Sequence, residues 1–452
     1  MGQPEVVVQS ERKRSKNFDE VSLGYPKKLA LQEAKRALQC LKPGEKEGCP
    51  LEVDIPAFVR ALCGNHPVEA LSKIREQNPL PSVCGRVCTA PCEIAGLRNE
   101  QDDPPAIRAL ERFAADFGKP KFALRKTQAR AGKKVAVIGS GPAGLSAAAA
   151  LAHKGYRVTV FEAFDQPGGV LRYGIPSFRL PAKVLEEDIQ EIKFLGVEIK
   201  TNCYAGKSIN LPDLTTQGFE AVLLATGAGV VRLQDISGAN LGGVYYGEEF
   251  LLRLNQFQRQ REKDDDLRLG ARVVVLGSQY LALDCARAAL RLGKQVTWVS
   301  PGALEDKKVI PEESVYAAQE GVHIEALVKP LEIVGNDQHF ARAVKCLRLD
   351  YADTRATGHW ELTPVPDSDF VIEADSVIIA MGHTPNSLIK RDVPQLKVND
   401  DGTVWTDPDD SSTSIRGIFA CGNVVTNATA VVEAMASGKK AAVDIENYLQ
   451  KK

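Results

Sequence analysis

The sequence has a net charge of only −1 and no long hydrophobic run, and its first residues do not show the pattern of a secretory signal. Its 57 Lys and Arg residues nearly balance 58 Asp and Glu residues, so no global positive field would attract nucleic acid or an anionic membrane. No apolar stretch reaches the length of a bilayer span, and residues 1–20 contain no continuous apolar segment of a secretory signal. These absences predict a cytoplasmic protein with no membrane span and no nucleic-acid partner.

Motifs of several catalytic classes are missing too. The six histidines form no cluster with metal-ligand spacing, and neither G-x-S-x-G nor a P-loop is present. No C-x-x-C pair occurs, which argues against a dithiol relay and against a zinc site with paired cysteines. Nothing in the sequence indicates a site for an organic substrate.

The ten cysteines are unevenly distributed along the chain. Four are scattered after residue 200, and the other six lie before residue 93. In a cytosolic chain such crowding indicates metal binding rather than disulfides. The six are Cys40, Cys49, Cys63, Cys84, Cys88 and Cys92.

The 452 residues predict about three domains at roughly 150 residues each. Residues 1–130 show apolar residues three and four apart, separated by Pro and Gly breaks, which predicts a helical domain. The basic stretch at 117–134 is predicted to be a linker.

From residue 133 the pattern changes to strand, glycine-rich turn, helix and strand. KKVAVIG, a helix of small residues and YRVTVFE form one such unit, and ARVVVLG, an amphipathic helix and KQVTWVS form a second. Two βαβ units predict an α/β protein with two Rossmann-like, doubly wound dinucleotide-binding domains. The order of the motifs predicts that the second is inserted in the first. The expected boundaries are 131–235 and 375–452 for the first fold and 236–374 for the second.

The first βαβ unit carries a dinucleotide fingerprint. Gly139, Gly141 and Gly144 form G-x-G-x-x-G directly after a strand and at the start of a helix. The first glycine permits the tight turn, the second lets the backbone approach a pyrophosphate, and the third lets helix and strand pack closely. Glu162 ends the second strand, where a carboxylate can bond ribose hydroxyls. The alternative is a glycine-rich turn that binds no ligand.

Seven motifs in series carry a family resemblance. They are IPAFVRAL, NPLPSVCGRVC, VAVIGSGPAGLSAA, GGVLRYGIPSFRLP, VLLATGA, VIIAMGHTPN and GIFACGN. In this order they resemble the FAD- and NAD(P)H-binding small subunit of glutamate synthase and its relatives. These relatives include the N-terminal half of dihydropyrimidine dehydrogenase and the large subunit of the NADH-dependent ferredoxin:NADP oxidoreductase. The resemblance covers nearly the whole chain.

The resemblance implies that the first fold binds FAD, with residues 171–181 near the isoalloxazine. Relatives usually have Asp where this chain has Asn423, so one contact to the flavin's ribityl–phosphate portion is altered, although Asn423 also suits a loop cap. The cofactor-binding residues that the resemblance implies, beyond the fingerprint glycines and Glu162, are Pro142, Ala143, Gly169, Leu171, Arg179, Thr226, Gly227, Gly382, Gly422, Asn423, Thr429 and Ala430.

The second fingerprint departs from the family pattern. Relatives have G-x-G-x-x-A, whereas this chain has Gly277 followed by Gln279 at the second glycine position, where a side chain should crowd a pyrophosphate. The arginine pair that accompanies NADPH in relatives is also missing, so a 2′-phosphate has no evident bidentate partner. Two alternatives remain: the site binds NADH, or it binds no nucleotide. Asp284 matches a residue near the nicotinamide path in relatives, or is an ordinary helix carboxylate.

Relatives carry two [4Fe–4S] clusters in the helical domain. Of the four positions that hold one of them, Ala37, Cys40, Glu45 and Gly96, only one is a thiol, so that cluster is predicted to be absent. For the other, the resemblance implies one [4Fe–4S] cluster bound by Cys49, Cys88, Cys92 and Glu111. Cys84 is the competitor for the fourth position, and a helical domain with leftover thiols and no metal is the alternative.

These features together predict an electron-transfer enzyme subunit. The expected cofactors are FAD and one [4Fe–4S] cluster, with NADH as the candidate hydride partner and NADPH less favoured. The expected partner is a protein subunit or a ferredoxin-like carrier, within a hetero-oligomer. One alternative is an FAD and iron–sulfur conduit that has lost nicotinamide binding, and another is a non-catalytic scaffold.

Overall fold

The structure is a computed structural model. It describes residues 2–41, 48–95, 103–119, 132–231, 236–260, 267–302, 311–354, 359–384, 388–426 and 430–452. Most of the expected linker at 117–134 lies outside these residues, as do Glu45, Gly96 and Thr429.

The N-terminal part is helical, as the sequence predicts. Asp54 accepts a hydrogen bond from Ala57 N (2.9 Å) and caps α3, and prolines begin several of the helices, where a missing N–H carries no penalty. Its helices are α1 (Glu11–Arg14), α2 (Lys27–Cys40), α3 (Ile55–Cys63), α4 (Pro67–Arg75), α5 (Pro81–Val87), α6 (Pro91–Ala95) and α7 (Ile107–Phe117). Strands β1 (Val7–Val8) and β2 (Ser22–Gly24) form a small two-stranded antiparallel sheet.

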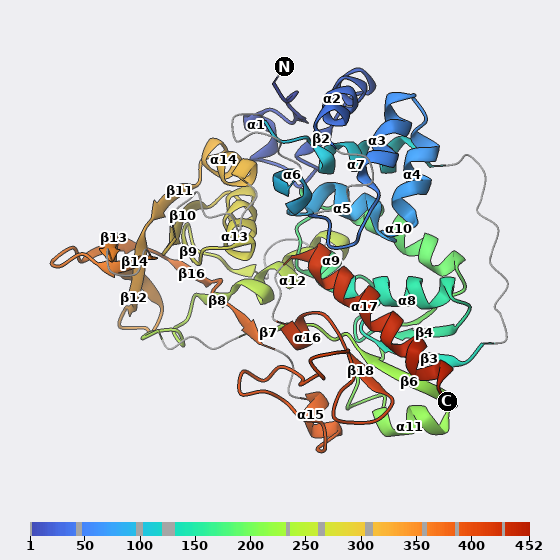
Figure 1. The fold of residues 1–452 in the computed structure, drawn as a ribbon. Helices are drawn as coiled ribbons and strands as arrows, with labels where there is room; N and C mark the ends of the chain where they lie inside the picture. The colour runs from blue at the N-terminus through green and yellow to red at the C-terminus, as the bar shows by residue number, and fades with distance from the viewer. Residues whose placement is uncertain are drawn as a thin grey trace.

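A parallel five-stranded sheet forms the first nucleotide module, in the order β18-β6-β3-β4-β5 (Figure 1). The strands are β3 (Lys134–Ile138), β4 (Arg157–Phe161), β5 (Glu198–Lys200), β6 (Phe219–Leu224) and β18 (Ile418–Ala420). Its helices are α8 (Pro142–His153), α9 (Val170–Tyr173), α10 (Ala182–Phe194), α11 (Leu211–Thr216), α15 (Leu388–Asp392), α16 (Asn423–Thr426) and α17 (Val431–Gln450). Because β18 comes from the end of the chain and pairs with β6, the predicted insertion is confirmed.

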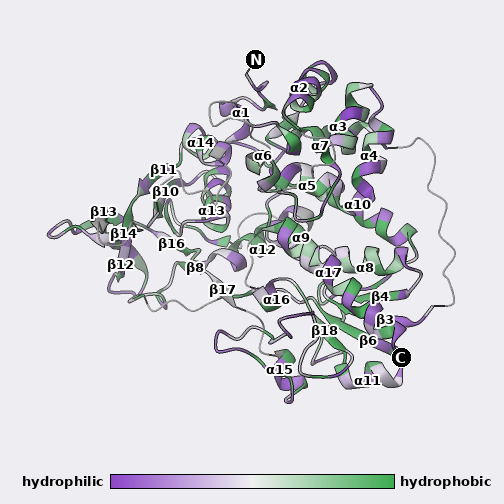
Figure 2. Ribbon diagram, viewed as in Figure 1, coloured by the Kyte–Doolittle hydropathy of each residue, from purple (hydrophilic) through white to green (hydrophobic). Residues whose placement is uncertain are grey.

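The second module has its own parallel sheet, in the order β11-β10-β9-β16-β8. Its elements are β8 (Val244–Tyr246), α12 (Gly247–Gln260), β9 (Arg272–Leu276), α13 (Tyr280–Arg291), β10 (Gln295–Ser300), α14 (Pro311–Glu320), β11 (His323–Ala326) and β16 (Ser376–Ile379). Figure 2 shows hydrophobic residues concentrated on the strands of both parallel sheets.

One domain boundary needs correction. The expected return to the first fold at residue 375 is too early, because β16 pairs with β9 and β8 in the second sheet. A buried four-residue strand carries the same hydrophobic pattern in either sheet, so the sequence could not assign it. Strands β7 (Val230–Val231) and β17 (His383–Thr384) then pair antiparallel between the two modules.

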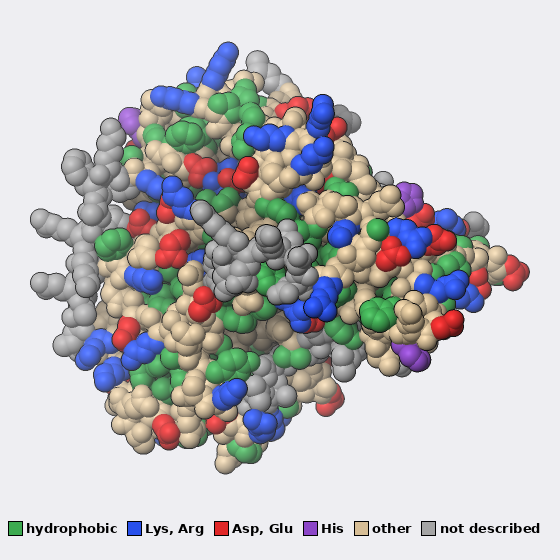
Figure 3. All heavy atoms as spheres, turned by 180° about the vertical axis from the view of Figure 1, so that it is seen from behind, with side chains coloured by type: hydrophobic (Ala, Val, Ile, Leu, Met, Phe, Trp, Pro, Cys, Tyr) green, Lys and Arg blue, Asp and Glu red, His purple; other side chains and the backbone are tan. Residues whose placement is uncertain are grey.

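The second module also contains an antiparallel sheet where a doubly wound fold would have a helical crossover. It joins β12 (Val328–Gly335), β13 (Ala341–Thr354), β14 (His359–Pro364) and β15 (Phe370–Glu373). In Figure 3 this lobe projects from the molecule and carries cationic, anionic and apolar side chains side by side. Phe340, Tyr351, Leu362 and Val371 are its exposed large hydrophobic residues.

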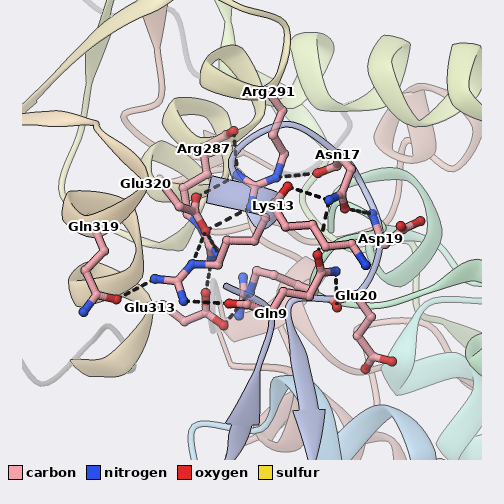
Figure 4. Close-up of polar contacts among 12 residues, drawn as sticks. Gln9, Lys13, Asn17, Asp19, Glu20, Arg287, Arg291, Glu313, Gln319 and Glu320 are labelled. Atoms are coloured by element: carbon pink, nitrogen blue, oxygen red, sulfur yellow. Dashed lines mark hydrogen bonds and ion pairs between the residues drawn. The ribbon is translucent and has the colours of Figure 1, made fainter. Parts of the chain in front are cut away.

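A buried ionic cluster joins the N-terminal segment to the second module (Figure 4). Glu320 of α14 accepts hydrogen bonds from Arg287 (2.7 Å) and Arg291 (2.8 Å) of α13, and the Arg14 Nε of α1 lies 3.3 Å from it. Buried charges persist only when they are paired, so these contacts hold α1, α13 and α14 in a single arrangement.

Candidate functional site

The three fingerprint glycines in the turn between β3 and α8 have different structural roles. Gly139 has φ +106°, which favours glycine. A Cβ at Gly144 would lie 2.0 Å from the Gly139 carbonyl oxygen, so close helix–strand packing requires glycine there. Gly141 is different: as the N-cap of α8 it has φ −68°, which any residue adopts, and a Cβ there would meet nothing within 4 Å. Its missing side chain therefore keeps the space above the helix N-terminus open, where an anion is favoured.

Glu162 lies beside this turn and is buried. Its carboxylate accepts hydrogen bonds from the hydroxyl and the backbone N–H of Ser140, and from Phe164 N (2.8 Å). The Ser140 hydroxyl in turn accepts the N–H of Gly168 (2.9 Å), at the start of the GGVLRYGIPSFRLP segment. Glu162 thus ties the segment to the turn, and its contact with a ribose stays a prediction.

Several other predicted FAD residues gather around the first turn of α8. A Cβ at Gly169 would lie 2.8 Å from the Cα of Gly141, and one at Gly422 would lie 2.8 Å from the Cβ of Ala143. Pro142 begins α8 and Leu171 is buried in α9, while Ala430 is the N-cap of α17. Gly382 follows β16 and so lies in the second module.

Two buried polar atoms in this region have no hydrogen-bond partner among the residues that the structure describes. They are the Thr226 Oγ1, next to Gly227 after β6, and the Asn423 Oδ1, at the start of α16. Buried polar groups are normally paired, and an unpaired one costs about 1–3 kcal/mol. Both atoms belong to the segments predicted to contact FAD. The open approach at Gly141 and these two unpaired atoms fit a dinucleotide cofactor.

Arg179 is paired with acidic and aromatic side chains of the second module. Its Nη1 donates to the Asp284 Oδ2 (2.7 Å), its guanidinium carbon lies 4.7 Å from the centre of the Tyr280 ring, and its Nε lies 3.5 Å from Glu313. Burial raises the pKa of Asp284 to about 6, although Arg179 opposes this rise. Arg179 therefore connects the GGVLRYGIPSFRLP segment to α13 and α14. Its predicted contact with a cofactor stays a prediction.

The second fingerprint turn reproduces the first in its backbone. A Cβ at Gly277 would lie 2.2 Å from the Ala380 carbonyl oxygen. Gln279 is the N-cap of α13 with φ −124° and ψ −176°, the position that Gly141 holds in α8. The turn therefore forms without the second glycine, and the Gln279 side chain starts from the position that Gly141 leaves open.

The predicted cluster ligands line one small cavity in the helical domain. Cys49 precedes α3, Cys88 ends α5, Cys92 lies in α6 and Glu111 lies in α7, and all four face this cavity. Cys84 faces it too, and its Sγ lies 3.6 Å from the Met435 Sδ of α17. The structure thus brings the four predicted ligands and their competitor together. The side chain of Cys40 lies outside the described residues.

The donor atoms around this cavity are in an environment that disfavours their charged forms. Burial raises the pKa of Cys88 to about 12 and of Glu111 to about 8, and it also raises the pKa of Cys49 and Cys92. A bound metal centre reverses this preference, because thiolates are its ligands and binding releases their protons. Three thiols and a carboxylate around one buried cavity therefore fit an iron–sulfur cluster.

Within the described part of the chain, no three His, Cys, Asp or Glu side chains are placed to hold a single metal ion. A [4Fe–4S] cluster distributes its protein ligands over four irons, so its donors surround a cavity rather than one point. The cavity is lined by donors from four separate segments, which is compatible with this second kind of site.

Asp188 of α10 supports the thiol cavity from the first module, although no motif of the sequence points to it. Its Oδ2 accepts the backbone N–H groups of Ser82 (2.9 Å) and Val83 (3.1 Å), at the N-terminus of the helix that carries Cys84 and ends at Cys88. No local pattern marks a cap supplied from 105 residues or more along the chain. Burial raises the pKa of Asp188 to about 6.

Replacing Asp188 by alanine is expected to destabilise the contact between α10 of the first module and α5 of the helical domain. The change leaves two buried N–H groups without an acceptor, and each such group costs about 1–3 kcal/mol. Asp188→Asn keeps an oxygen acceptor and removes a buried ionisable group, so its loss should be smaller. Chemical unfolding followed by circular dichroism measures both variants. An alanine variant as stable as the wild type would show that the cap is unimportant.

Helix α17 connects the two candidate cofactor sites. Val432 in its first turn lines the thiol cavity. One turn and a half further on, a Cβ at Gly438 would lie 2.1 Å from the Ala143 carbonyl oxygen, so α17 packs directly on the first turn of α8. The thiol cavity and the open N-terminus of α8 therefore both lie beside α17.

Comparison with known families places this geometry in context. Residues 133–438 match the family described as pyridine nucleotide-disulphide oxidoreductase, and residues 14–121 match the one described as dihydropyrimidine dehydrogenase domain II, 4Fe-4S cluster. Among solved structures, FprA from Mycobacterium tuberculosis is similar in fold, with a TM-score of 0.58, 16% sequence identity, and coverage of 71% of this chain and 85% of that one.

Several curated proteins are similar over most of the chain. The NADP(+)-dependent formate dehydrogenase subunit beta of Moorella thermoacetica is 36% identical over 89% of this chain, but this chain spans only 59% of its length. The glutamate synthase [NADPH] small chain of Azospirillum brasilense is 31% identical, with 97% of this chain and 93% of that protein covered. The NAD-dependent dihydropyrimidine dehydrogenase subunit PreT of Salmonella typhimurium is 32% identical, with 96% and 97% covered.

Proposed function

We propose a function from the premise that this chain belongs to the pyridine nucleotide-disulphide oxidoreductase family, in the group of the glutamate synthase small chain that carries a 4Fe-4S domain ahead of it. The resemblance predicted from the sequence motifs is thereby confirmed. Our proposal is an FAD-containing NAD(P)H oxidoreductase subunit with one [4Fe–4S] cluster, which exchanges hydride with a nicotinamide nucleotide and single electrons with a partner protein.

The observation that carries this proposal is the position of α17 between the two sites. Val432 and Met435 of this helix approach the thiols, while Gly438 packs on the first turn of α8. Bound FAD would accept a hydride and release electrons singly, and the cluster would take them one at a time. The protein's own part is to place both groups beside α17. The cofactor contacts would be Thr226, Asn423 and the N-terminus of α8. The cluster ligands would be Cys49, Cys88, Cys92 and Glu111.

The nicotinamide nucleotide is proposed to be NADH. No arginine pair follows β10 to bind a 2′-phosphate, since the strand ends at Ser300 and the chain continues as Pro301 and Gly302. The printed names of the relatives include both NAD and NADPH, so they do not decide the matter.

A second candidate function has an observation of its own in favour. Gln279 stands where a pyrophosphate would approach α13, and Arg179 is paired with Asp284 on the same helix. Both features suit an FAD and iron–sulfur conduit that binds no nicotinamide and receives its electrons from another protein.

Anaerobic titration with NADH and NADPH distinguishes these two functions. Flavin reduction is followed by the loss of absorbance at about 450 nm. We expect bleaching with NADH at concentrations at least about tenfold below those needed with NADPH. No bleaching with either nucleotide, in a protein that contains flavin, would favour the conduit.

The Gln279→Gly variant tests the cause of any weak binding. Removing the side chain should reopen the approach to the helix N-terminus and lower the half-saturating NADH concentration by about tenfold, or about 1.4 kcal/mol. Gln338→Gly, in an exposed turn of the same module, is the matched control. Equal titrations for all three proteins would show that Gln279 does not obstruct the site.

The proposed partner is a protein that accepts or supplies single electrons, within a hetero-oligomer. Two of the similar proteins are named as subunits and one as a small chain. In the described part of the chain, no helix combines the length and hydrophobicity needed to cross a bilayer. Copurification of a tagged chain with iron–sulfur or substrate-binding subunits tests this proposal.

A further inference from the structure

We propose that Asn78 is a positioning residue that orients Glu111 toward the thiol cavity, an inference that rests on the proposed cluster. Asn78 lies in the loop between α4 and α5 and is 1% exposed. Its Nδ2 donates to the Glu111 Oε1 over 2.7 Å, and its Oδ1 accepts the backbone N–H of Leu80 over 2.9 Å.

These two bonds determine which way the amide points. The Leu80 N–H needs an acceptor, so the oxygen of Asn78 must face it and the NH₂ group must face Glu111. The backbone N–H of Asn78 is bonded to the Ile74 carbonyl oxygen (2.9 Å), which fixes the loop at the end of α4. The Asn78 Nδ2 that donates to Glu111 is therefore fixed in place by the side-chain bond to Leu80 and by the backbone bond to Ile74.

The hydrogen bond occupies one oxygen of Glu111 and leaves the other available. Glu111 Oε1 is bonded to Asn78, whereas Oε2 has no hydrogen-bond donor among the residues that the structure describes. Both Asn78 and Glu111 line the cavity that Cys49, Cys88 and Cys92 face. The arrangement presents a single carboxylate oxygen to the position where the fourth ligand is needed.

A carboxylate needs such a support more than a thiolate does. It can turn about its terminal torsion, and beside three thiolates it would be repelled unless a donor holds it. Hydrogen bonds to ligating side chains typically change metal affinity by about 10–100-fold. The Asn78 amide nitrogen supplies the donor, and its oxygen accepts the N–H of Leu80, the N-cap residue of the helix that carries Cys84.

The two roles of Asn78 can be separated by substitution. Asn78→Asp keeps an oxygen for the Leu80 N–H but replaces the donor toward Glu111 by an acceptor. Glu111→Gln alone sets an amide against the Asn78 amide, so that the new side-chain oxygen turns to Asn78 and not to the cavity. When both substitutions are combined, the new amide at position 111 donates to the new carboxylate at position 78. Its oxygen then faces the cavity again, and the original net charge is restored.

The experiment measures iron per chain, the EPR spectrum of the reduced protein and the flavin content of the intact chain. Each single variant should lose at least about threefold in iron content or change the EPR g values, and the double variant should recover both. Asn65→Asp, the same change in an exposed turn after α3, is the control. Flavin content and melting temperature report whether each variant is folded. If Asn78→Asp proves destabilised, Asn78→Ser is compared with the control in its place.

An Asn78→Asp protein with wild-type iron content and an unchanged EPR spectrum would overturn the inference. A double variant that behaves no better than the single variants would also overturn it, because the recovery depends on the hydrogen bond itself. A wild-type protein without iron would instead contradict the proposed function, so the two failures are distinguishable.

Discussion

Replacing Cys88 by serine is expected to remove the iron–sulfur cluster while the flavin stays bound. Cys88 ends α5 and is 8% exposed, and its Sγ accepts the Ala90 N–H over 3.3 Å. This bond aims the sulfur at the cavity shared with Cys49, Cys92 and Glu111. A serine hydroxyl is a poor substitute for a thiolate as a ligand of an iron–sulfur cluster. Cys84 also faces the cavity, so recovery of iron in Cys88→Ser would point to Cys84 as a replacement ligand.

The measurements are iron per chain, visible absorbance and EPR of the reduced protein. Iron should fall from about four per chain to below about one, while flavin stays near one per chain. Cys63→Ser is the matched control, because Cys63 is a half-buried thiol at the end of α3 that does not line the cavity. A Cys88→Ser protein that keeps its iron and its spectrum would show that the ligands lie elsewhere.

A second variant, Gly141→Gln, is expected to lose its flavin. The backbone at Gly141 has φ −68° and a Cβ would meet no protein atom within 4 Å, so the variant should fold without strain. The cost arises only when a cofactor is present, because the new side chain projects into the space above the N-terminus of α8. The second module already shows that such a turn forms with glutamine, at Gln279.

Flavin per chain and the affinity for added FAD report the result. We expect affinity to fall by at least about a hundredfold, or about 2.8 kcal/mol, with the iron content retained. His153→Gln introduces the same side chain at the other end of α8 and should leave the flavin in place. Full flavin content in Gly141→Gln would mean that the pyrophosphate does not lie on this helix.

The candidate FAD site could be located from the sequence because its determinants are local. A strand, a glycine turn and a helix follow one another within residues 134–153, and the spacing of Gly139, Gly141 and Gly144 reflects backbone geometry that neighbouring residues impose on each other. The unpaired atoms of Thr226 and Asn423 could not be located in this way, since burial depends on what packs over them.

The sequence by itself determined the class of the protein: a helical, cysteine-bearing domain, two nucleotide modules with one inserted in the other, and the identity of the residues available as ligands. Only the tertiary structure placed β16 in the second sheet and brought Cys49, Cys88 and Glu111 to one cavity. It also showed that Asp188 accepts N–H groups of α5 and that Asp284 pairs with Arg179, contacts between residues about a hundred positions apart. Helix and strand periodicities arise from bonds between near neighbours, whereas a contact between distant segments depends on how whole elements pack and which buried charges must then be paired.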